Sequence, residues 1–227
     1  MKNAILIFIL VAMSPSSFAQ IQKGAGYFGG VLSGNYTNGE NPAGSYSYSN
    51  SSNSWNFNIS YGHYLTDRFA IGIGAGMYLS DYQNESVGIN FSSTNKQSSM
   101  LYYVAPFIRT SKKISDNFYC FANFSLQAGT GPVKETYSSS NNETELTNAT
   151  QSTLGAGLTG GLNYFLNRHF ALYLSYGNIT YNNTTIENDD ESDGTDKATS
   201  DALNVNLGLS SITIGLQYFI NNNTDKK

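Results

Sequence analysis

The sequence Leu65-Thr-Asp-Arg-Phe69 lies between two runs of alternating apolar and small residues. The same pattern returns as Ile114-Ser-Asp-Asn-Phe118 and as Leu166-Asn-Arg-His-Phe170. Each copy joins an apolar residue to a phenylalanine through three polar residues, and short polar segments of this kind form tight turns. These three turns separate much longer polar connections, so tight turns and long connections alternate along the chain.

Alternation with a period of two residues indicates β-strands on both sides of each turn. In residues 69–82, for example, Phe69, Ile71 and Ile73 share one face while Gly72 and Gly74 share the other. The same pattern predicts about eight strands in all. Their expected ranges are residues 23–38, 54–65, 69–82, 99–114, 118–129, 153–166, 170–181 and 203–220.

Four long connections remain between these strands, at residues 39–53, 83–98, 130–150 and 182–202. They are rich in Ser, Asn and Thr, whose side chains form hydrogen bonds with the nearby backbone, and in Gly, which accepts unusual backbone angles. The composition predicts mobile surface loops.

The first residues have the form of an export signal. Lys2 precedes the apolar residues 4–13, and the small-x-small sequence Ser17-Phe-Ala19 follows. The apolar run is much shorter than the roughly 20 residues that a spanning helix needs. We therefore expect a signal peptide over residues 1–19, one β-domain over residues 20–220 and a polar tail over residues 221–227.

Composition narrows the class of protein. Charged residues make up 12% of the chain, whereas Tyr (17), Phe (13) and Gly (22) are abundant; soluble domains average about 25% charged residues. The net charge of -4 argues against a nucleic-acid partner, which requires clustered Lys and Arg. Cys120 is the single cysteine and excludes an intrachain disulfide. No sequence pattern suggests a cofactor.

The two faces of the predicted strands indicate which one meets lipid. A soluble β-sandwich would place charged residues on its second face, but here that face is Gly, Ser, Ala, Thr, Asn and Tyr. Small side chains fit the interior of a narrow barrel of about eight strands. We predict an all-β, antiparallel up-and-down transmembrane barrel with short periplasmic turns and long extracellular loops. A soluble secreted sandwich is the alternative.

Several side chains have expected places in such a barrel. Arg109 falls on the inward parity and is the candidate for a charge inside the lumen, because a lipid-facing arginine at mid-depth costs about 2 to 4 kcal/mol. Aromatic residues near the tight turns are expected to form a girdle at the membrane interface. These are Phe69, Phe118, Phe170, Tyr64, Tyr164 and Tyr218.

The chain resembles the outer-membrane β-barrel family of small eight-stranded proteins, the group that includes the OmpA transmembrane domain and OmpX. The resemblance rests on the glycine-rich strand Ile71-Gly-Ile-Gly-Ala-Gly76, the repeated turns and the last strand, Ile214-Gly-Leu-Gln-Tyr-Phe-Ile220. It implies a location in the outer membrane, contact with outer-membrane lipid and recognition by the outer-membrane assembly machinery.

No catalytic or metal site can be derived from the sequence. His63 and His169 are the two histidines, both are expected near the tight-turn rim, and no Ser-His-Asp arrangement is readable. One acidic segment is either a solvated loop or a weak site for divalent ions or surface binding. Its residues are Glu187, Asp189, Asp190, Glu191, Asp193 and Asp196.

The sequence therefore predicts a non-enzymatic outer-membrane barrel with a structural or adhesive role; it does not determine the oligomeric state, and a monomer is favoured. Any extracellular ligand is expected to bind the long connections, because side chains fill so narrow a lumen. Two alternatives remain open: a narrow passive channel or transporter of hydrophobic small molecules, and a barrel enzyme.

Overall fold

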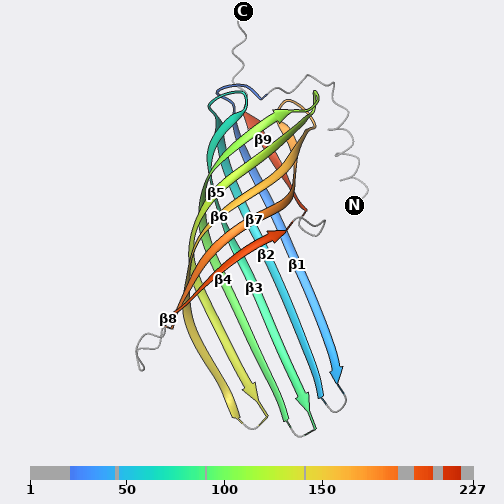
Figure 1. Cartoon of the computed structure of the whole chain (residues 1–227), viewed down its shortest axis with the longest axis vertical. Helices are drawn as coiled ribbons and strands as arrows, with labels where there is room; N and C mark the ends of the chain where they lie inside the picture. Colours follow the sequence, from blue (N-terminus) through green and yellow to red (C-terminus); the bar gives the residue numbers. More distant parts are fainter. Residues whose placement is uncertain are drawn as a thin grey trace, which may run out of the picture.

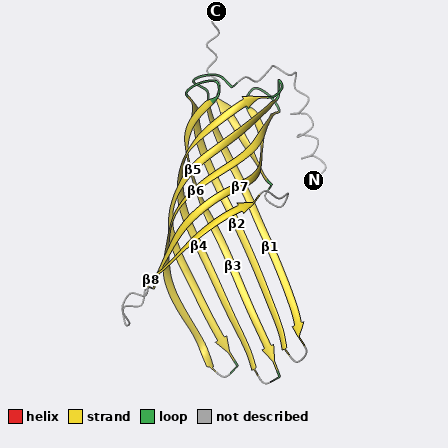
Figure 2. Cartoon of the chain, in the orientation of Figure 1, coloured by secondary structure: helices red, strands yellow, loops and turns green. Residues whose placement is uncertain are grey.

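The computed structural model describes residues 21–43, 46–89, 91–140, 142–188, 197–206 and 212–220. The expected signal peptide and polar tail lie outside these residues. The described part of the chain contains strands and turns and no helix (Figure 2), so none there is long and apolar enough to cross a membrane. The strands are β1 (Gly26–Ala43), β2 (Tyr46–Tyr64), β3 (Phe69–Gly88), β4 (Phe91–Lys113), β5 (Phe118–Ser139), β6 (Asn142–Phe165), β7 (Phe170–Asn188), β8 (Lys197–Asn206) and β9 (Thr213–Ile220).

The strands form one antiparallel sheet that closes into a ring (Figure 1). Each strand from β1 to β7 pairs with the next, and β9 lies between β7 and β1 and closes the ring. The ring therefore contains β1 to β7 and β9, while β8 pairs with the far part of β7. This is the up-and-down barrel predicted from the alternating pattern.

The three repeated turns have the same backbone geometry. The amides of Leu65 and Thr66 donate to the Phe69 carbonyl at 2.8 and 3.2 Å. The same two bonds are made to Phe118, at 2.8 and 3.2 Å, and to Phe170, at 2.9 and 3.3 Å. The prediction of tight turns at these positions is confirmed.

Most of the four long connections are paired strands, so the prediction of irregular loops there was wrong. Strands β3 and β4 stay paired from Phe69 and Thr110 to Gly88 and Phe91, and the other connections likewise continue the hairpins. In Figure 1 the hairpins of β1 to β6 run on well past the closed part of the barrel as one sheet. Ser, Asn and Thr form strands here because each backbone group finds a cross-strand partner, and both faces meet water, so no apolar alternation marks them.

The last predicted strand, residues 203–220, is two strands in the structure. Strand β9 pairs with residues 170–175 of β7, and β8 pairs with residues 178–187. Between these two stretches Gly177 has a φ of 76°, and the β6–β7 register shifts beside Thr159 and Gly160. This bulge redirects β7 from one partner to the other.

Candidate functional site

The outer surface of the closed barrel carries an apolar belt. Its members are half-exposed, as with Ile59 and Ile73, both 54% exposed. The belt ends at a row of paired residues, Trp55, Leu79 and Met100, beyond which most outward side chains are polar. At about 3.3 Å per residue, the strand from Phe69 to Leu79 is about 33 Å long. A strand tilt of about 40° reduces its height along the barrel axis to about 25 Å, which is the height of the apolar band of membrane barrels.

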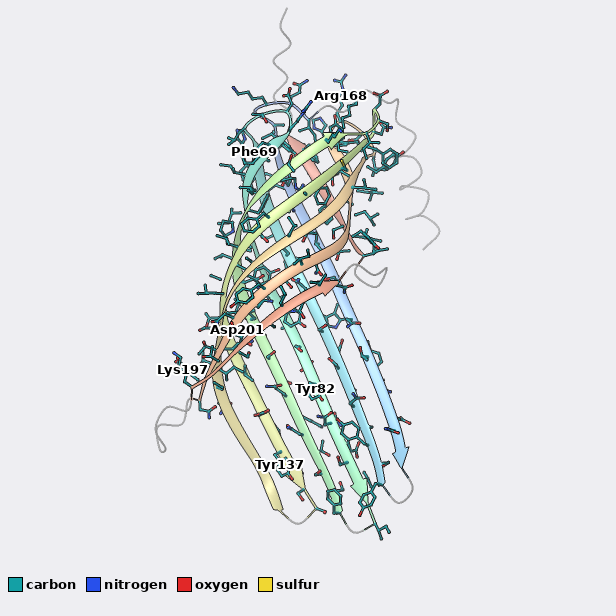
Figure 3. All side chains as sticks on the ribbon, in the orientation of Figure 1. Phe69, Tyr82, Tyr137, Arg168, Lys197 and Asp201 are labelled. Carbon is teal, nitrogen blue, oxygen red and sulfur yellow. The ribbon has the colours of Figure 1, made fainter. Side chains whose placement is uncertain are left out.

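Aromatic side chains mark the tight-turn edge of this belt. Figure 3 shows Phe69 and Arg168 at that end of the barrel. Phe118 packs on Tyr164 with ring centroids 4.7 Å apart, and Phe170 packs on Tyr218 at 5.1 Å. Each of the five predicted girdle residues Phe69, Phe118, Tyr164, Phe170 and Tyr218 is between 37% and 42% exposed.

The assignment of Tyr64 to this girdle was wrong. Tyr64 is fully buried inside the barrel, and its hydroxyl lies 2.9 Å from the Ser111 Oγ. The reason is parity: on β2 the even-numbered residues face the lumen, so Tyr64 points inward while Tyr61 points outward. An aromatic residue at a strand end is a girdle residue only if it also has the outward parity.

Aromatic rings close the tight-turn end of the lumen. Tyr27 stacks on Phe219 at 5.3 Å, and Phe165 packs on Phe219 at 4.8 Å. Several rings lie over a glycine directly opposite on the neighbouring strand, where a Cβ would collide with the ring. These pairs are Tyr27 with Gly62, Phe107 with Gly72, Phe121 with Gly161 and Tyr103 with Gly76. We call the buried cluster the aromatic floor; it contains Ile21, Ala25, Tyr27, Tyr64, Ala70, Tyr119, Phe165, Ala171 and Phe219.

Arg109 lies inside the lumen, next to the aromatic floor on the side away from the tight turns, and is 2% exposed. Its Nε donates to Asn123 Oδ1 at 2.7 Å, and its Nη1 donates to Gln217 Oε1 at 3.3 Å. The guanidinium carbon also lies 4.8 Å from the ring centroid of Tyr27 and 4.5 Å from that of Phe121. The rings and amide oxygens stabilise the cation without cancelling its charge.

The lumen contains a cavity of about 280 Å³ on the side of Arg109 that is away from the tight turns. Arg109, Asn123 and Gln217 line its inner end, and hydroxyl and amide groups line its walls. The Tyr103 hydroxyl donates to Asn56 Oδ1 at 2.8 Å and accepts from Asn58 Nδ2 at 3.3 Å, so part of the wall is fixed in place. Glycines and apolar side chains share the lining, so the cavity offers hydrogen-bond partners to a small polar molecule on part of its wall.

The acidic segment is described at one of its six residues. Glu187 is the last residue of β7 that pairs with β8, and its carboxylate forms an ion pair with Lys197 at 2.6 Å. The other residues of the segment lie outside the described residues: Asp189, Asp190, Glu191, Asp193 and Asp196. Nearby, Asp201 accepts hydrogen bonds from Asn183 and Tyr181 at 2.9 and 2.7 Å, which lower the pKa of its carboxyl. Within the ranges that the structure describes, no three potential ligands gather as for a metal ion.

The hairpins beyond the belt carry a second candidate site that the sequence did not suggest. We call the part of β1 to β6 that lies beyond the row of Trp55, Leu79 and Met100 the projecting sheet. Its inner face continues the face that lines the lumen. On that face Tyr48, Tyr82 and Tyr137 are 43%, 37% and 46% exposed, and Tyr48 donates to Asn84 at 2.8 Å. Figure 3 shows Tyr82 and Tyr137 on this part of the molecule. The alternation Tyr46-Ser-Tyr48 was the one signal that could have indicated it.

The comparisons with known proteins agree with this architecture. A model of the outer membrane protein beta-barrel domain matches residues 4–210, which is most of the chain. The chain belongs to this outer membrane β-barrel family. The predicted family and outer-membrane location are thereby confirmed. In this family the tight turns face the periplasm, so the projecting sheet extends from the cell surface.

Solved outer membrane proteins are among the structures that match. The crystal structure of OprG from Pseudomonas aeruginosa is 12% identical, with 88% of this chain and 98% of that chain covered and a TM-score of 0.38. Ail, the attachment invasion locus protein of Yersinia pestis, is 13% identical, with coverages of 88% and 100% and a TM-score of 0.32. No curated protein sequence matches this outer membrane barrel.

Proposed function

We propose that this outer membrane barrel is a surface-interaction protein that uses its projecting sheet as an adhesive platform. The observation that carries the proposal is the inner face of that sheet, where exposed tyrosines stand among Ser and Asn side chains on paired strands. Tyrosine supplies rigid, amphipathic contact area at low entropic cost, and Ser and Asn supply adaptable hydrogen bonds. Antibody binding loops use the same residue types for recognition.

Two further features support adhesion over transport. The aromatic floor fills the periplasmic end of the lumen with closely packed rings, which leaves no wide path for a solute. The cavity above it contains the Arg109 guanidinium and several amides and hydroxyls, which a hydrophobic cargo would have to desolvate. The non-enzymatic role also belongs to this proposal, and a lipid-hydrolysis assay tests it.

The proposal is tested by comparing two double variants on the same strands. Tyr82→Ser with Tyr137→Ser removes two rings from the inner face of the projecting sheet. Gln83→Ser with Thr136→Ser changes the adjacent residues, which point to the opposite face. Cells that produce each variant are tested for adhesion to surfaces coated with a neutral glycan, a protein or a lipopolysaccharide.

The tyrosine pair should weaken adhesion to the coating that holds wild-type cells by at least about tenfold, because buried aromatic contacts dominate interface energies. The control pair should bind as wild type does. Equal adhesion by the two double variants, at equal amounts of folded protein, would contradict the adhesive role of this face.

A further inference from the structure

Arg109 is a buried cation without an anionic partner in the described structure. The two ion pairs among the described residues join Lys113 to Asp116 and Lys197 to Glu187, both at the surface. None of the described acidic side chains is buried. The partners of Arg109 are instead amide oxygens, aromatic rings and the Tyr64 hydroxyl. A buried charge with neutral partners alone is costly, and an anion beside it would offset that cost.

The surroundings of Arg109 are arranged to hold it in one position. Gln217 Oε1 accepts from Arg109 Nη1 and also from Asn163 Nδ2, at 3.0 Å. Asn123 fixes the Nε side, and the rings of Tyr27 and Phe121 hold the guanidinium on its faces. A guanidinium has five N–H donors, and the bonds to Asn123, Gln217 and Tyr64 leave further donors for a ligand.

A ligand can reach the Arg109 guanidinium through the lumen cavity from the cell-surface side. Arg109 lies at its inner end, next to the aromatic floor, while Gln127 and Asn182 line it toward the projecting sheet. Its volume of about 280 Å³ is at the lower limit for small-molecule sites. Asn56, Asn58, Ser60 and Tyr103 on its wall can bond to hydroxyl groups of a ligand.

We propose that the lumen cavity binds a small hydroxylated carboxylate, with its carboxylate on Arg109 and its hydroxyls on the amide and hydroxyl wall. A planar guanidinium matches a carboxylate with two parallel hydrogen bonds, and the water-poor interior strengthens that pair. The aromatic floor stops the ligand at Arg109, so the site is a receptor pocket and not a passage. The site is independent of the adhesive face, because it lies within the barrel.

The test uses the folded, full-length protein in detergent and isothermal titration calorimetry with sodium gluconate. Glucose serves as the neutral analogue, and acetate and inorganic phosphate serve as the other anions, all at constant ionic strength. Gluconate should bind saturably and more tightly than glucose or acetate. The proposal would be overturned if gluconate did not bind at concentrations up to about 10 mM; a Kd of that size corresponds to a binding free energy of only about 3 kcal/mol. A preference for phosphate over gluconate would overturn it too.

Variants then assign the binding to Arg109. Arg109→Met keeps much of the side-chain length without its charge and should weaken gluconate binding by at least about tenfold. Lys134→Gln removes a cation from the outer face of the projecting sheet and should leave the affinity unchanged. Equal affinity in Arg109→Met and wild type would exclude this site.

A second route does not depend on the folding of the Arg109 variant. Ser125→Phe places a ring in the cavity wall and leaves the Arg109 side chain itself unchanged. It should abolish gluconate binding while the protein keeps its heat-modifiable migration in gel electrophoresis. Gluconate binding that survives in folded Ser125→Phe would place the ligand elsewhere and contradict the proposal.

Discussion

At the scale of the residue, parity decides what each side chain meets. Tyr61 and Tyr64 are close in β2, yet Tyr61 is 40% exposed on the belt and Tyr64 is fully buried in the aromatic floor. Both are aromatic residues near a turn, so composition and position along the chain do not separate them. Successive strand residues point to opposite faces, and this rule alone separates the two.

Parity also explains the glycines that face interior rings. Replacing Gly72 with Leu would force a side chain into the Phe107 ring and the backbone of β2. We expect a loss of about 1 to 3 kcal/mol in stability, the usual cost of overpacking. Gly30→Ala is the matched control, since nothing lies within 4 Å of a Cβ there. Urea unfolding in lipid vesicles measures both, and a Gly72→Leu protein as stable as Gly30→Ala would contradict the packing of the floor.

The lipid-facing assignment leads to a second prediction on β3. Ile73→Arg places a charge in the middle of the apolar belt and should destabilise the inserted protein by about 2 to 4 kcal/mol. Gln83→Arg lies on the same strand and face beyond the Leu79 row, so its side chain meets water and its cost should be near zero. Vesicle refolding in urea gives both values. Similar costs at the two positions would mean that the belt does not end where the outward residues become polar.

At the scale of the element, the sequence predicted the closed part of the barrel well and the hairpins beyond it poorly. Residues 69–82 alternate without interruption, because one face meets lipid and the other meets the crowded lumen. Residues 83–88 continue the same strand without that contrast, since water lies on both sides. Hydrophobic periodicity reports burial and not backbone pairing, so it could not distinguish a polar hairpin from a loop.

The candidate sites follow the same division. The inward position of Arg109 could be predicted by counting back with period two from Ile114, in the tight turn that follows β4. Its partners Asn123 and Gln217 could not, since Gln217 is far away in sequence and its approach depends on how β9 closes the ring. The tyrosines of the projecting sheet come from strands β2, β3 and β5, and their common face requires the hairpin register.

The extended hairpins change what a protease should do to intact cells. Lys96 and Lys134 lie in the projecting sheet with paired strands on both sides. A protease needs a locally unfolded segment, so trypsin should spare both bonds in intact cells and cut both after heat denaturation. Mass spectrometry of the released peptides shows which bonds were cut. Rapid cleavage at Lys96 and Lys134 in intact cells would favour the mobile loops that the composition suggested.

At the scale of the whole molecule, one continuous sheet serves two purposes. Near the tight turns it closes on itself, and its interior is sealed by the aromatic floor. Beyond the belt the strands β1 to β6 continue as an open sheet, in which β7 stays paired with β6 and β8 pairs with the far part of β7 (Figure 1). Pairing within each hairpin satisfies the projecting backbone, so we expect the closed barrel to form without it.

This separation predicts that the projecting sheet can be removed without loss of the barrel. Residues 39–50, 84–95 and 135–147 each lie between two paired residues, so replacing each segment with Asn-Gly keeps the register of its hairpin. The shortened protein should insert and keep its heat-modifiable migration, because the belt, the aromatic floor and the Arg109 cavity remain. It should bind gluconate as the full protein does and adhere more weakly, because Tyr48 and Tyr137 are removed, as measured by calorimetry and cell attachment. Loss of folding would show that the projecting hairpins stabilise the barrel, and adhesion at the wild-type level would place the adhesive surface in the part that remains.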